Sequence, residues 1–485
     1  MQSSIQSKVE EKLRRYQSGL DLRVLDLFAG CGGISLGFEA AGFTISAAVE
    51  FDPIAAESHA AAFHSGESEH AKARDITKLD ASDLVEDLGL GSADEAFDIV
   101  VGGPPCQAYA RVGRAKLREV AEHPEAFRVD PRASLFLRYL AWIEETAPIA
   151  VMMENVPDVL NHAGHNIADE VCEALEAMGY DCKYSLLNAA HYGVPQMRDR
   201  VFLIGVHRVA NSEICFPAAS NYHDLPVGYA GTRAVALKHV DQKGGRWVAP
   251  DLGSKDLPGP ITSADALSDL KPITLHLEGK LKRGARRFTE GQGYRSRPKT
   301  DYQRLMRCWE GHESPGEVFD HVIRYLPRDT EIFRHMPEGG EYPAAHAVAV
   351  ELFEKEAVLR GLSRDSADWV ELYKKMVPPY PVHTFPNRWG KLRKRGPART
   401  LMAHLGKDCY SHIHYDDDQA RTISVREAAR LQGFPDGFRF SGTMNPAFRQ
   451  IGNAVPPLLA RAVAVEMKRS IDSSKLVGTT ATAAE

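Results

Sequence analysis

The sequence predicts an α/β fold built on a doubly wound sheet. Over roughly the first 200 residues, short apolar runs typical of buried parallel strands alternate with segments of helical length. Two of these runs end in rigid turns rich in glycine or proline, at 29–33 and 102–105. In such a sheet, ligands bind at the carboxyl ends of the strands, so these turns are the first candidates for a site.

The predicted strands are short apolar runs, and the predicted helices have apolar residues three and four positions apart or recognisable end signals. Pro53 suits the first turn of a helix, and Gly42 and Gly179 suit helix ends. We expect strands at 23–28, 45–49, 97–101, 149–153, 183–188 and 201–206. We expect helices at 5–16, 33–42, 53–63, 81–88, 134–146 and 167–178.

The pattern changes between about 208 and 400, where periodicity is poor. Residues 280–307 hold ten basic and two acidic side chains, and residues 388–399 contain no acid. Because the whole chain carries a net charge of −6, two basic runs in this half indicate a phosphate-binding surface. A helical insertion at 344–375 lies between them and carries no chemistry that we can read.

Regular structure returns at 422. Ser424 and Glu427 form a capping-box pattern that predicts a helix ending at Gly433. The run QIGNAVPP at 450–457 then precedes an apolar helix at 458–467, and the tail is expected to be disordered.

Composition excludes several classes of protein. A chain of 485 residues is too long for one core and predicts two or three domains. The seven cysteines have irregular spacing, without a disulfide framework or a CxxC metal pair. No secretory signal and no apolar run of about 18 residues is present. We therefore expect a cytoplasmic protein without a metal or a membrane contact.

Four polar residues are the candidates for catalysis. Cys106 follows the Gly-Gly-Pro-Pro turn, and a thiolate at such a place can act as a nucleophile. Glu154 follows the strand at 149–153, where a carboxyl group can act as a general acid. Arg198 and Arg200 are two residues apart at the start of a strand, so they share one face.

The glycine turn at 29–33 predicts a second site. Glu50 follows Gly30 by 20 residues, an offset at which an acid commonly accepts hydrogen bonds from ribose hydroxyls. The turn departs from the dinucleotide pattern GxGxxG, because Ser35 stands where the third glycine would fall.

Three motifs occur in a characteristic order: PPCQ at 104–107, ENV at 154–156 and QMRDR at 196–200. Together they resemble the DNA (cytosine-5)-methyltransferases common in bacteria and phages. The resemblance covers roughly 22–206 and 420–467. It implies a Rossmann-like S-adenosylmethionine-dependent methyltransferase sheet with a second, smaller target-recognition domain. The implied domains are a catalytic and cofactor-binding domain at 1–207, a target-recognition domain with insertions at 208–440, a return to the catalytic domain at 441–472 and a disordered tail at 473–485.

The resemblance also implies the reaction. A methyl group would pass from S-adenosylmethionine to carbon 5 of a cytosine flipped out of a specific duplex DNA sequence, through a covalent adduct with Cys106. Glu154 would act at ring nitrogen 3 and Arg200 at the ring carbonyl, while Arg198 would assist there or hold Glu154 or the loop. A restriction–modification or phage-defence setting would add a cognate restriction endonuclease or other defence-system proteins as partners.

Further roles follow from the same resemblance. The cofactor residues would be Phe28, Ala29, Gly30, Cys31, Gly32 and Gly33 at the methionine end, Glu50 at the ribose, Phe51, Asp75 and Ile76 at the adenine, and Pro105, Leu135 and Asn453 around them. The expected DNA contacts are Gln107, Arg111, Arg114, Arg286, Arg287, Arg295, Arg297, Arg393 and Arg395.

Three other functions share some of these sequence features. An RNA (tRNA) cytosine-5 methyltransferase shares the motifs, but the large basic segment favours duplex DNA. A catalytically inactive DNA-binding member is disfavoured because Cys106, Glu154 and Arg200 are all present. A nicotinamide dehydrogenase is suggested by the glycine turn alone.

The chain departs from the family pattern in having Ala110 where serine is usual and in a long loop before Leu135, and both are expected to affect loop closure and rate.

Overall fold

The computed structural model describes residues 2–105, 134–162, 164–281, 288 and 290–474, and the chain forms two compact units. The first unit comprises Met1–Gly193, Met197–Gly259 and Ala454–Glu485, and the second comprises Val194–Gln196 and Pro260–Asn453. Residues 208–259 therefore pack with the first unit. The functional division at 208 and 440, with target recognition between them, stays a prediction.

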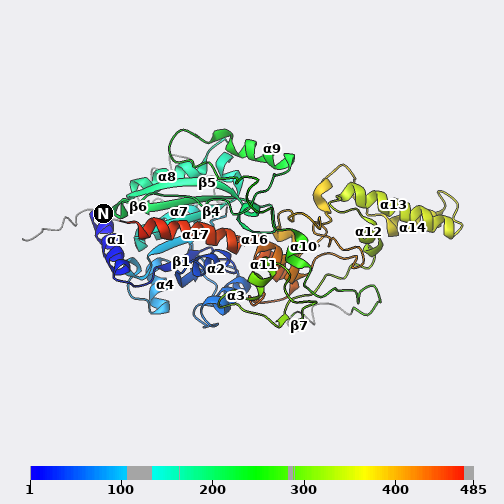
Figure 1. Cartoon of the computed structure of the whole chain (residues 1–485), viewed down its shortest axis with the longest axis horizontal. Coiled ribbons are helices and arrows are strands. Elements are labelled where there is room, and N and C mark those ends of the chain that lie inside the picture. Colours follow the sequence, from blue (N-terminus) through cyan, green and yellow to red (C-terminus); the bar gives the residue numbers. More distant parts are fainter. Residues whose placement is uncertain (1, 106–133, 163, 282–287, 289, 475–485) are drawn as a thin grey trace, which may run out of the picture. The chain divides into compact units, whose positions relative to one another are not determined.

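The first unit is built on a six-stranded sheet with the order β2-β1-β3-β4-β6-β5 (Figure 1). Its strands are β1 (Arg23–Leu27), β2 (Thr44–Val49), β3 (Ile99–Gly102), β4 (Ala150–Asn155), β5 (Tyr180–Asn188) and β6 (Asp199–His207). β1 pairs in parallel with β2 and β3, and β3 pairs in parallel with β4. The predicted α/β fold is confirmed, and the carboxyl ends of these four strands lie at one edge of the sheet.

β6 runs against its neighbours and pairs antiparallel with both β4 and β5. The connection from β5 to β6 contains only the short helix η4 (Ala189–Tyr192), whereas a parallel pair needs a crossover of about a dozen residues or more. As a result β6 begins at the edge where β4 ends, with Val201 opposite Asn155 and Phe202 opposite Glu154.

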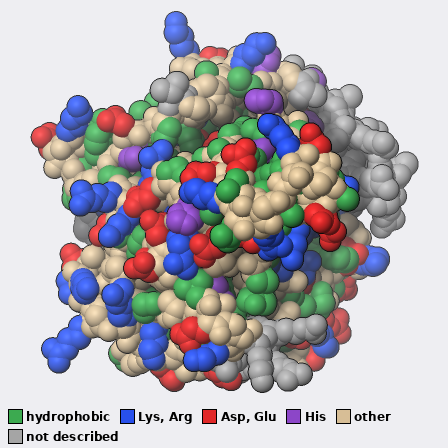
Figure 2. Space-filling model, turned by 90° about the vertical axis from the view of Figure 1, so that its right-hand side faces the viewer, with side chains coloured by type: hydrophobic (Ala, Val, Ile, Leu, Met, Phe, Trp, Pro, Cys, Tyr) green, Lys and Arg blue, Asp and Glu red, His purple; other side chains and the backbone are tan. Residues whose placement is uncertain are grey.

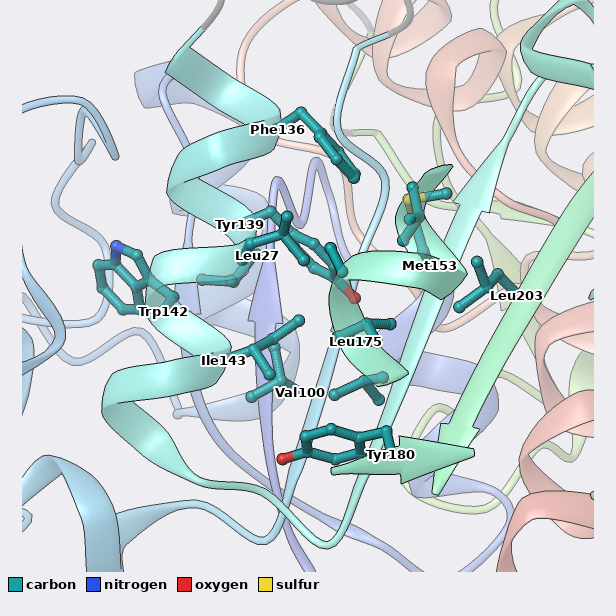
Figure 3. Packing of buried hydrophobic residues seen from close by; sticks show 14 of the residues in the cluster. Leu27, Val100, Phe136, Tyr139, Trp142, Ile143, Met153, Leu175, Tyr180 and Leu203 are labelled. Carbon is teal, nitrogen blue, oxygen red and sulfur yellow. The ribbon is translucent and has the colours of Figure 1, made fainter. Parts of the chain in front are cut away.

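A helical layer covers one face of this sheet. Figure 3 shows Phe136, Tyr139 and Ile143 of α7 directed towards Val100, Met153 and Leu203 of the strands. The hydroxyl group of Tyr139 donates a hydrogen bond to the backbone oxygen of Met152 at 3.0 Å, so its polar end is satisfied inside the core. The helices that contribute to this core are α4 (Ala81–Leu88), α5 (Ala93–Ala96), α7 (Ser134–Thr146) and α8 (Ile167–Ala177).

The segment after the second unit returns to the first as α17 (Pro457–Asp472), which packs along α2 (Gly33–Glu39) (Figure 1). The contact is close because α2 carries glycines: a Cβ atom at Gly37 would lie 2.6 Å from the Cβ atom of Ala460. The remaining helices of this unit are α1 (Gln2–Gln17), α3 (Pro53–Phe63), η3 (Pro157–Asn161), η5 (Arg208–Ala210), α9 (Val227–Ala236) and η6 (Leu237–His239).

The helix α1 is attached to the sheet by a buried lysine. The Lys12 ammonium group donates hydrogen bonds to the backbone oxygens of Phe97 and Thr146, both at 2.6 Å, and of Ala147 at 3.0 Å. Val9 and Leu13 of the same helix are fully buried.

The second unit is mainly helical and contains a buried ionic network. Arg430 donates to Asp436 at 2.7 Å and to Asp269 at 2.8 Å, and all three side chains are fully buried. Its elements are α10 (Ser263–Leu267), β7 (Gln292–Gly293), α11 (Asp301–Arg307), β8 (Glu317–Val318), α12 (Thr330–His335), α13 (Tyr342–Leu359), α14 (Ala367–Met376), η8 (Pro386–Arg388), η9 (Ala403–Gly406), α15 (Val425–Gln432) and α16 (Met444–Asn453).

Two predictions for this unit are confirmed. The capping box of Ser424 and Glu427 opens α15, which ends at Gly433, and the helical insertion is the pair α13 and α14, which pack against each other (Figure 1). α16 was not predicted. In the described part of the chain, no helix is both long and apolar enough to cross a membrane.

We expect Gly37→Ala to destabilise the first unit, because the added methyl group would overlap Ala460 and the backbone of α17. Overpacking of this kind costs about 1–3 kcal/mol, measurable by urea unfolding. The control is Gly228→Ala in α9, where an added Cβ atom meets nothing within 4 Å. That change should be neutral or stabilise by up to about 1 kcal/mol. Equal effects of the two changes would contradict this packing.

Candidate active site

The edge of the sheet where β4 ends and β6 begins brings two of the predicted catalytic residues together. The Nε atom of Arg200 lies 2.7 Å from Oε1 of Glu154, and both side chains are largely buried. Arg200 also donates a hydrogen bond to the backbone oxygen of Asp199 at 2.7 Å, which fixes the guanidinium group. The ENV and QMRDR motifs thus meet through strand pairing, although residues 157–195 separate them in the sequence.

Burial dominates the electrostatics of Glu154. It raises the pKa of the carboxyl group above its ordinary value, and the nearby charges of Arg200 and Arg198 oppose that rise without cancelling it. Arg198 itself is buried, with 1% of its surface exposed. A carboxyl group with a raised pKa, held in place by a guanidinium group, is suited to donating a proton.

The turn after β3 is fixed from β4. The side chain of Asn155 donates a hydrogen bond to the backbone oxygen of Pro104 at 2.7 Å, and its own carbonyl oxygen accepts from the backbone of Val156 at 2.9 Å. Gly103 passes close to Glu154, since a Cβ atom there would lie 3.1 Å from Oε2. The chain therefore reaches residue 105 along a constrained path beside Glu154.

Gln196 is a further motif residue whose role was not predicted. Its side-chain oxygen accepts a hydrogen bond from the backbone of Leu401 at 2.8 Å, and its nitrogen donates to Gln432 at 2.5 Å and to the backbone of Leu431 at 3.2 Å. The side chain is fully buried within the second unit. Asn155 and Gln196 both belong to the sequence motifs, but their role, which is to form hydrogen bonds to the backbone of other segments, is visible only in the fold.

The predicted glycine turn after β1 has a left-handed backbone at three positions. Phe28, Gly30 and Gly32 have φ angles of 61°, 57° and 99°. Such angles are unfavourable for a bulky residue like Phe28 and are typical of binding loops. A Cβ atom at Gly30 would meet nothing within 4 Å, so the backbone there is open to close approach by a ligand. A Cβ atom at Gly32 would overlap the ring of Phe63, so the second glycine allows the turn to pack against α3.

Glu50 is held against this turn. One carboxylate oxygen accepts a hydrogen bond from the backbone of Gly30 at 2.8 Å, and the other accepts from the backbone of Asp52 at 2.7 Å. Burial raises the pKa of Glu50, and these backbone donors oppose the rise. The neighbouring Phe51 is 71% exposed, which leaves its ring available for stacking.

The segment with Asp75 and Ile76 is joined to the same site, because the backbone of Arg74 donates a hydrogen bond to the backbone oxygen of Glu50 at 2.7 Å. Ile76 is buried, and its backbone oxygen accepts from Arg138 at 2.8 Å. Burial alone would raise the pKa of Asp75, but the hydrogen bonds from Thr77 and the pairing with Lys78 together outweigh it, so the pKa is lowered.

Within the described part of the chain, three other predicted cofactor residues make no contact that points to a role. Leu135 packs partly buried against the core, Pro105 is exposed, and Asn453 is the exposed last residue of α16 in the second unit. The predicted residues outside the described part of the chain are Cys106, Gln107, Arg111, Arg114, Arg286 and Arg287.

The described basic residues predicted to contact DNA are exposed side chains of the second unit: Arg295, Arg297, Arg393 and Arg395. Figure 2 shows Lys and Arg side chains interspersed with Asp and Glu over the face that it displays. The assignment of these arginines as DNA contacts stays a prediction.

Known proteins resemble the chain over nearly its whole length. Residues 22–469 match the family described as C-5 cytosine-specific DNA methylase. The chain belongs to that family. The predicted recognition is confirmed, and the protein is a DNA cytosine-5 methyltransferase.

Individual relatives support the same conclusion. The chain is 37% identical over 452 residues to a protein of Oceanobacillus iheyensis that bears the name type II methyltransferase M.OihORF3336P, with 92% of this chain and 95% of that protein covered. It is 32% identical over 481 residues to type II methyltransferase M.AgeI of Thalassovita gelatinovora, with 93% and 100% covered.

A solved structure shares the fold. The crystal structure of a protein described as a DNA modification methyltransferase encoded within an E. coli prophage aligns with a TM-score of 0.59 at 21% identity, covering 93% of this chain and 100% of that one.

We expect Arg200→Gln to raise the pKa of Glu154 further, because the change removes the nearest positive charge that opposes burial. An NMR titration of ¹³C-labelled glutamate would measure the shift. Arg208→Gln is the control, since Arg208 pairs with the exposed Asp181 and should leave Glu154 unchanged. A fall in the pKa of Glu154 in the Arg200 variant would refute this electrostatic account.

We expect Asn155→Ala to destabilise the protein and slow DNA methylation, because the backbone oxygen of Pro104 loses its buried donor. The lost bond should cost about 1–3 kcal/mol in urea unfolding, and misplacement of the turn should lower the rate about ten- to a hundredfold. The control, Asn161→Ala, removes a bond of 2.8 Å to the backbone of Val235 at an exposed place. Methylation at the normal rate by the Asn155 variant would show that the turn does not depend on this bond.

Proposed function

We propose that this enzyme transfers a methyl group from S-adenosylmethionine to carbon 5 of a cytosine flipped out of a specific duplex DNA sequence, through a transient bond to Cys106. The observation that carries the proposal is the pair of Glu154 and Arg200, 2.7 Å apart at the edge of the sheet, beside the turn that leads to Cys106. The type II names of its relatives support a setting in restriction–modification or phage defence, with a cognate endonuclease as partner.

The proposed chemistry begins with addition to the ring. The Cys106 thiolate forms a bond to carbon 6 of cytosine, and the electron pair of the ring double bond moves towards nitrogen 3, which takes a proton from Glu154. Arg200 stabilises the charge that develops on the ring carbonyl oxygen. Carbon 5 is then electron-rich and would accept the methyl group that S-adenosylmethionine supplies, with the electron pair of the broken bond staying on the donor sulfur. Nitrogen 3 returns its proton to Glu154, a base removes the proton from carbon 5, the bond to the Cys106 sulfur breaks, and the thiolate leaves.

The raised pKa of Glu154 supports its part in this sequence. Burial favours the protonated form of this carboxyl group more than exposure to water would, and the protonated form is the one that can deliver a proton to the ring. The side chains of Arg200 and Arg198 keep the group oriented and oppose any larger rise.

The residues around the glycine turn fit the proposed cofactor. S-adenosylmethionine would supply a methyl group on a positively charged sulfur. Glu50, fixed by two backbone donors, retains acceptor capacity for ribose hydroxyls, and the exposed ring of Phe51 can stack on adenine. The backbone of Gly30 and Gly32 would pass the methionine end, with Asp75 and Ile76 near the adenine edge.

The DNA part of the proposal rests on chemistry that a stacked duplex does not permit. Carbons 5 and 6 of cytosine become accessible only when the base leaves the helix, at a cost of a few kcal/mol. We assign sequence recognition to residues 208–440, where exposed Arg295, Arg297, Arg393 and Arg395 would meet phosphates.

We expect Cys106→Ala to lose methyl transfer by more than about a thousandfold while DNA binding persists, because the nucleophile alone is removed. Tritium transfer from the labelled cofactor and a gel-shift assay measure the two properties. Cys215→Ala is the matched control, as Cys215 is an exposed free cysteine. Normal turnover by the Cys106 variant would overturn the assignment.

A trapping experiment tests the covalent step separately. Duplex DNA with 5-fluorocytosine at the modified position should form a stable adduct with the wild-type enzyme in the presence of cofactor, since fluorine cannot leave as a proton does. The position itself comes from bisulfite mapping in a host free of cytosine methylation. A failure to form any adduct at a mapped position would count against the Cys106 mechanism.

A further inference from the structure

Three buried side chains form a hydrogen-bonded chain behind the glycine turn. Asp26 comes from β1, Ser35 from α2 and His59 from α3. The Ser35 Oγ atom lies 2.6 Å from Oδ2 of Asp26 and 2.9 Å from Nε2 of His59. No more than 1% of the surface of any of the three residues is exposed.

The hydrogen-bonded chain of Asp26, Ser35 and His59 lies against the glycine turn, and its His59 end belongs to the helix that follows Glu50. A Cβ atom at Gly32 would lie 3.1 Å from the ring of His59, and α3, which carries His59, begins directly after Glu50 and Asp52. Burial raises the pKa of the Cys31 thiol within the turn, and the charges of Glu50 and Asp26 add to that rise. Burial likewise raises the pKa of Asp26, with a smaller contribution from the charge of Glu50. The charge of Asp26 therefore acts on the turn where the cofactor is proposed to bind.

The two ends of the chain each keep an unused polar atom. Among the described residues, Oδ1 of Asp26 and Nδ1 of His59 are buried without a hydrogen-bond partner. With Ser35 donating to a charged Asp26, His59 must carry its proton on Nε2. If Asp26 takes up one proton, each bond can reverse: Asp26 donates to Ser35, Ser35 donates to Nε2, and the proton of His59 moves to Nδ1.

We propose that the Asp26–Ser35–His59 chain sets the charge beneath the cofactor turn and thereby favours the positively charged S-adenosylmethionine over its neutral product, S-adenosylhomocysteine. The inference rests on the proposed function of the turn. The buried carboxylate attracts the sulfonium cation and offers nothing comparable to the thioether that remains after methyl transfer. Ser35, which stands where a dinucleotide-binding turn has glycine, joins Asp26 to His59.

The preference should depend on pH, with a direction that follows from Asp26. Burial raises the pKa of Asp26 to about 7, opposed by the bond from Ser35. The carboxylate and the preference are thus present above that pH and lost below it. Burial lowers the pKa of His59 to about 3, so its ring stays neutral throughout. The other titratable groups near the chain are Cys31 and Glu50 beside the turn, and His64 and His70 after α3.

Calorimetry of the full-length enzyme with each of the two compounds tests the proposal. The ratio of the Kd of S-adenosylhomocysteine to that of S-adenosylmethionine should rise about tenfold between about pH 6 and pH 8.5. In Asp26→Asn, the ratio of the two Kd values should stay at its low-pH value over the whole pH range. Any remaining change should come only from titration of the amino group of S-adenosylmethionine itself. Asp98→Asn is the control, because Asp98 is equally buried but precedes β3 at the opposite edge of the sheet.

Two further measurements separate charge from structure. Ser35→Ala keeps the Asp26 carboxylate but removes the hydrogen bond that lowers its pKa. The midpoint, which is the pH at which the ratio of the Kd values has changed by half, should therefore move upward. The ¹⁵N shifts of His59 should report Nε2–H above the wild-type midpoint and Nδ1–H below it. A ratio independent of pH in the wild-type enzyme, a pH dependence unchanged in Asp26→Asn, or a single tautomer of His59 at all pH values overturns the inference. Failure of the wild-type enzyme to bind S-adenosylmethionine at any pH would instead overturn the proposed function.

Discussion

The antiparallel pairing of β6 with β4 is the constraint on which the candidate site depends. A parallel strand in the same place would put its first residues at the opposite edge of the sheet, and Arg200 would lie far from Glu154. Because β6 returns through a short connection, residues 199–201 arrive where β4 ends, with Val201 opposite Asn155. The pair of Glu154 and Arg200 is thus a product of strand direction, and the turn at Pro104 is held to the same edge by Asn155.

Buried charge is handled differently in the two units. In the second unit, Arg430 is paired with both Asp436 and Asp269, so each charge has close partners and the network holds loops together. In the first unit, Glu154 and Asp26 are buried with less compensation, and the pKa values of both carboxyl groups are raised. Both of these carboxyl groups lie where ligands are expected, and perturbed pKa values of this kind are common at functional sites.

The sequence predicted the strands well because each is a short apolar run bounded by turn residues. It did not reveal the direction of β6, since side chains alternate in the same way in parallel and antiparallel strands. The sequence does not predict α16, because Pro446 and Gly452 interrupt its helical pattern of apolar residues. The motifs predicted Glu154, Arg200, the glycine turn and Glu50 as site residues. They could not predict that Asp26, Ser35 and His59 meet, because three elements must pack before those side chains share hydrogen bonds.

The attachment of α1 has a consequence for where the fold begins. The family match starts at residue 22, yet Lys12 donates hydrogen bonds to three backbone carbonyl groups just before β3 and β4, and Val9 and Leu13 of the same helix are buried. A protein shortened to the matched segment would leave those carbonyl oxygens without the Lys12 donor and would expose the apolar surface that Val9 and Leu13 cover. The folded unit of this enzyme is therefore larger than the segment that matches the family, because its first helix supplies the donors for carbonyl groups that precede β3 and β4.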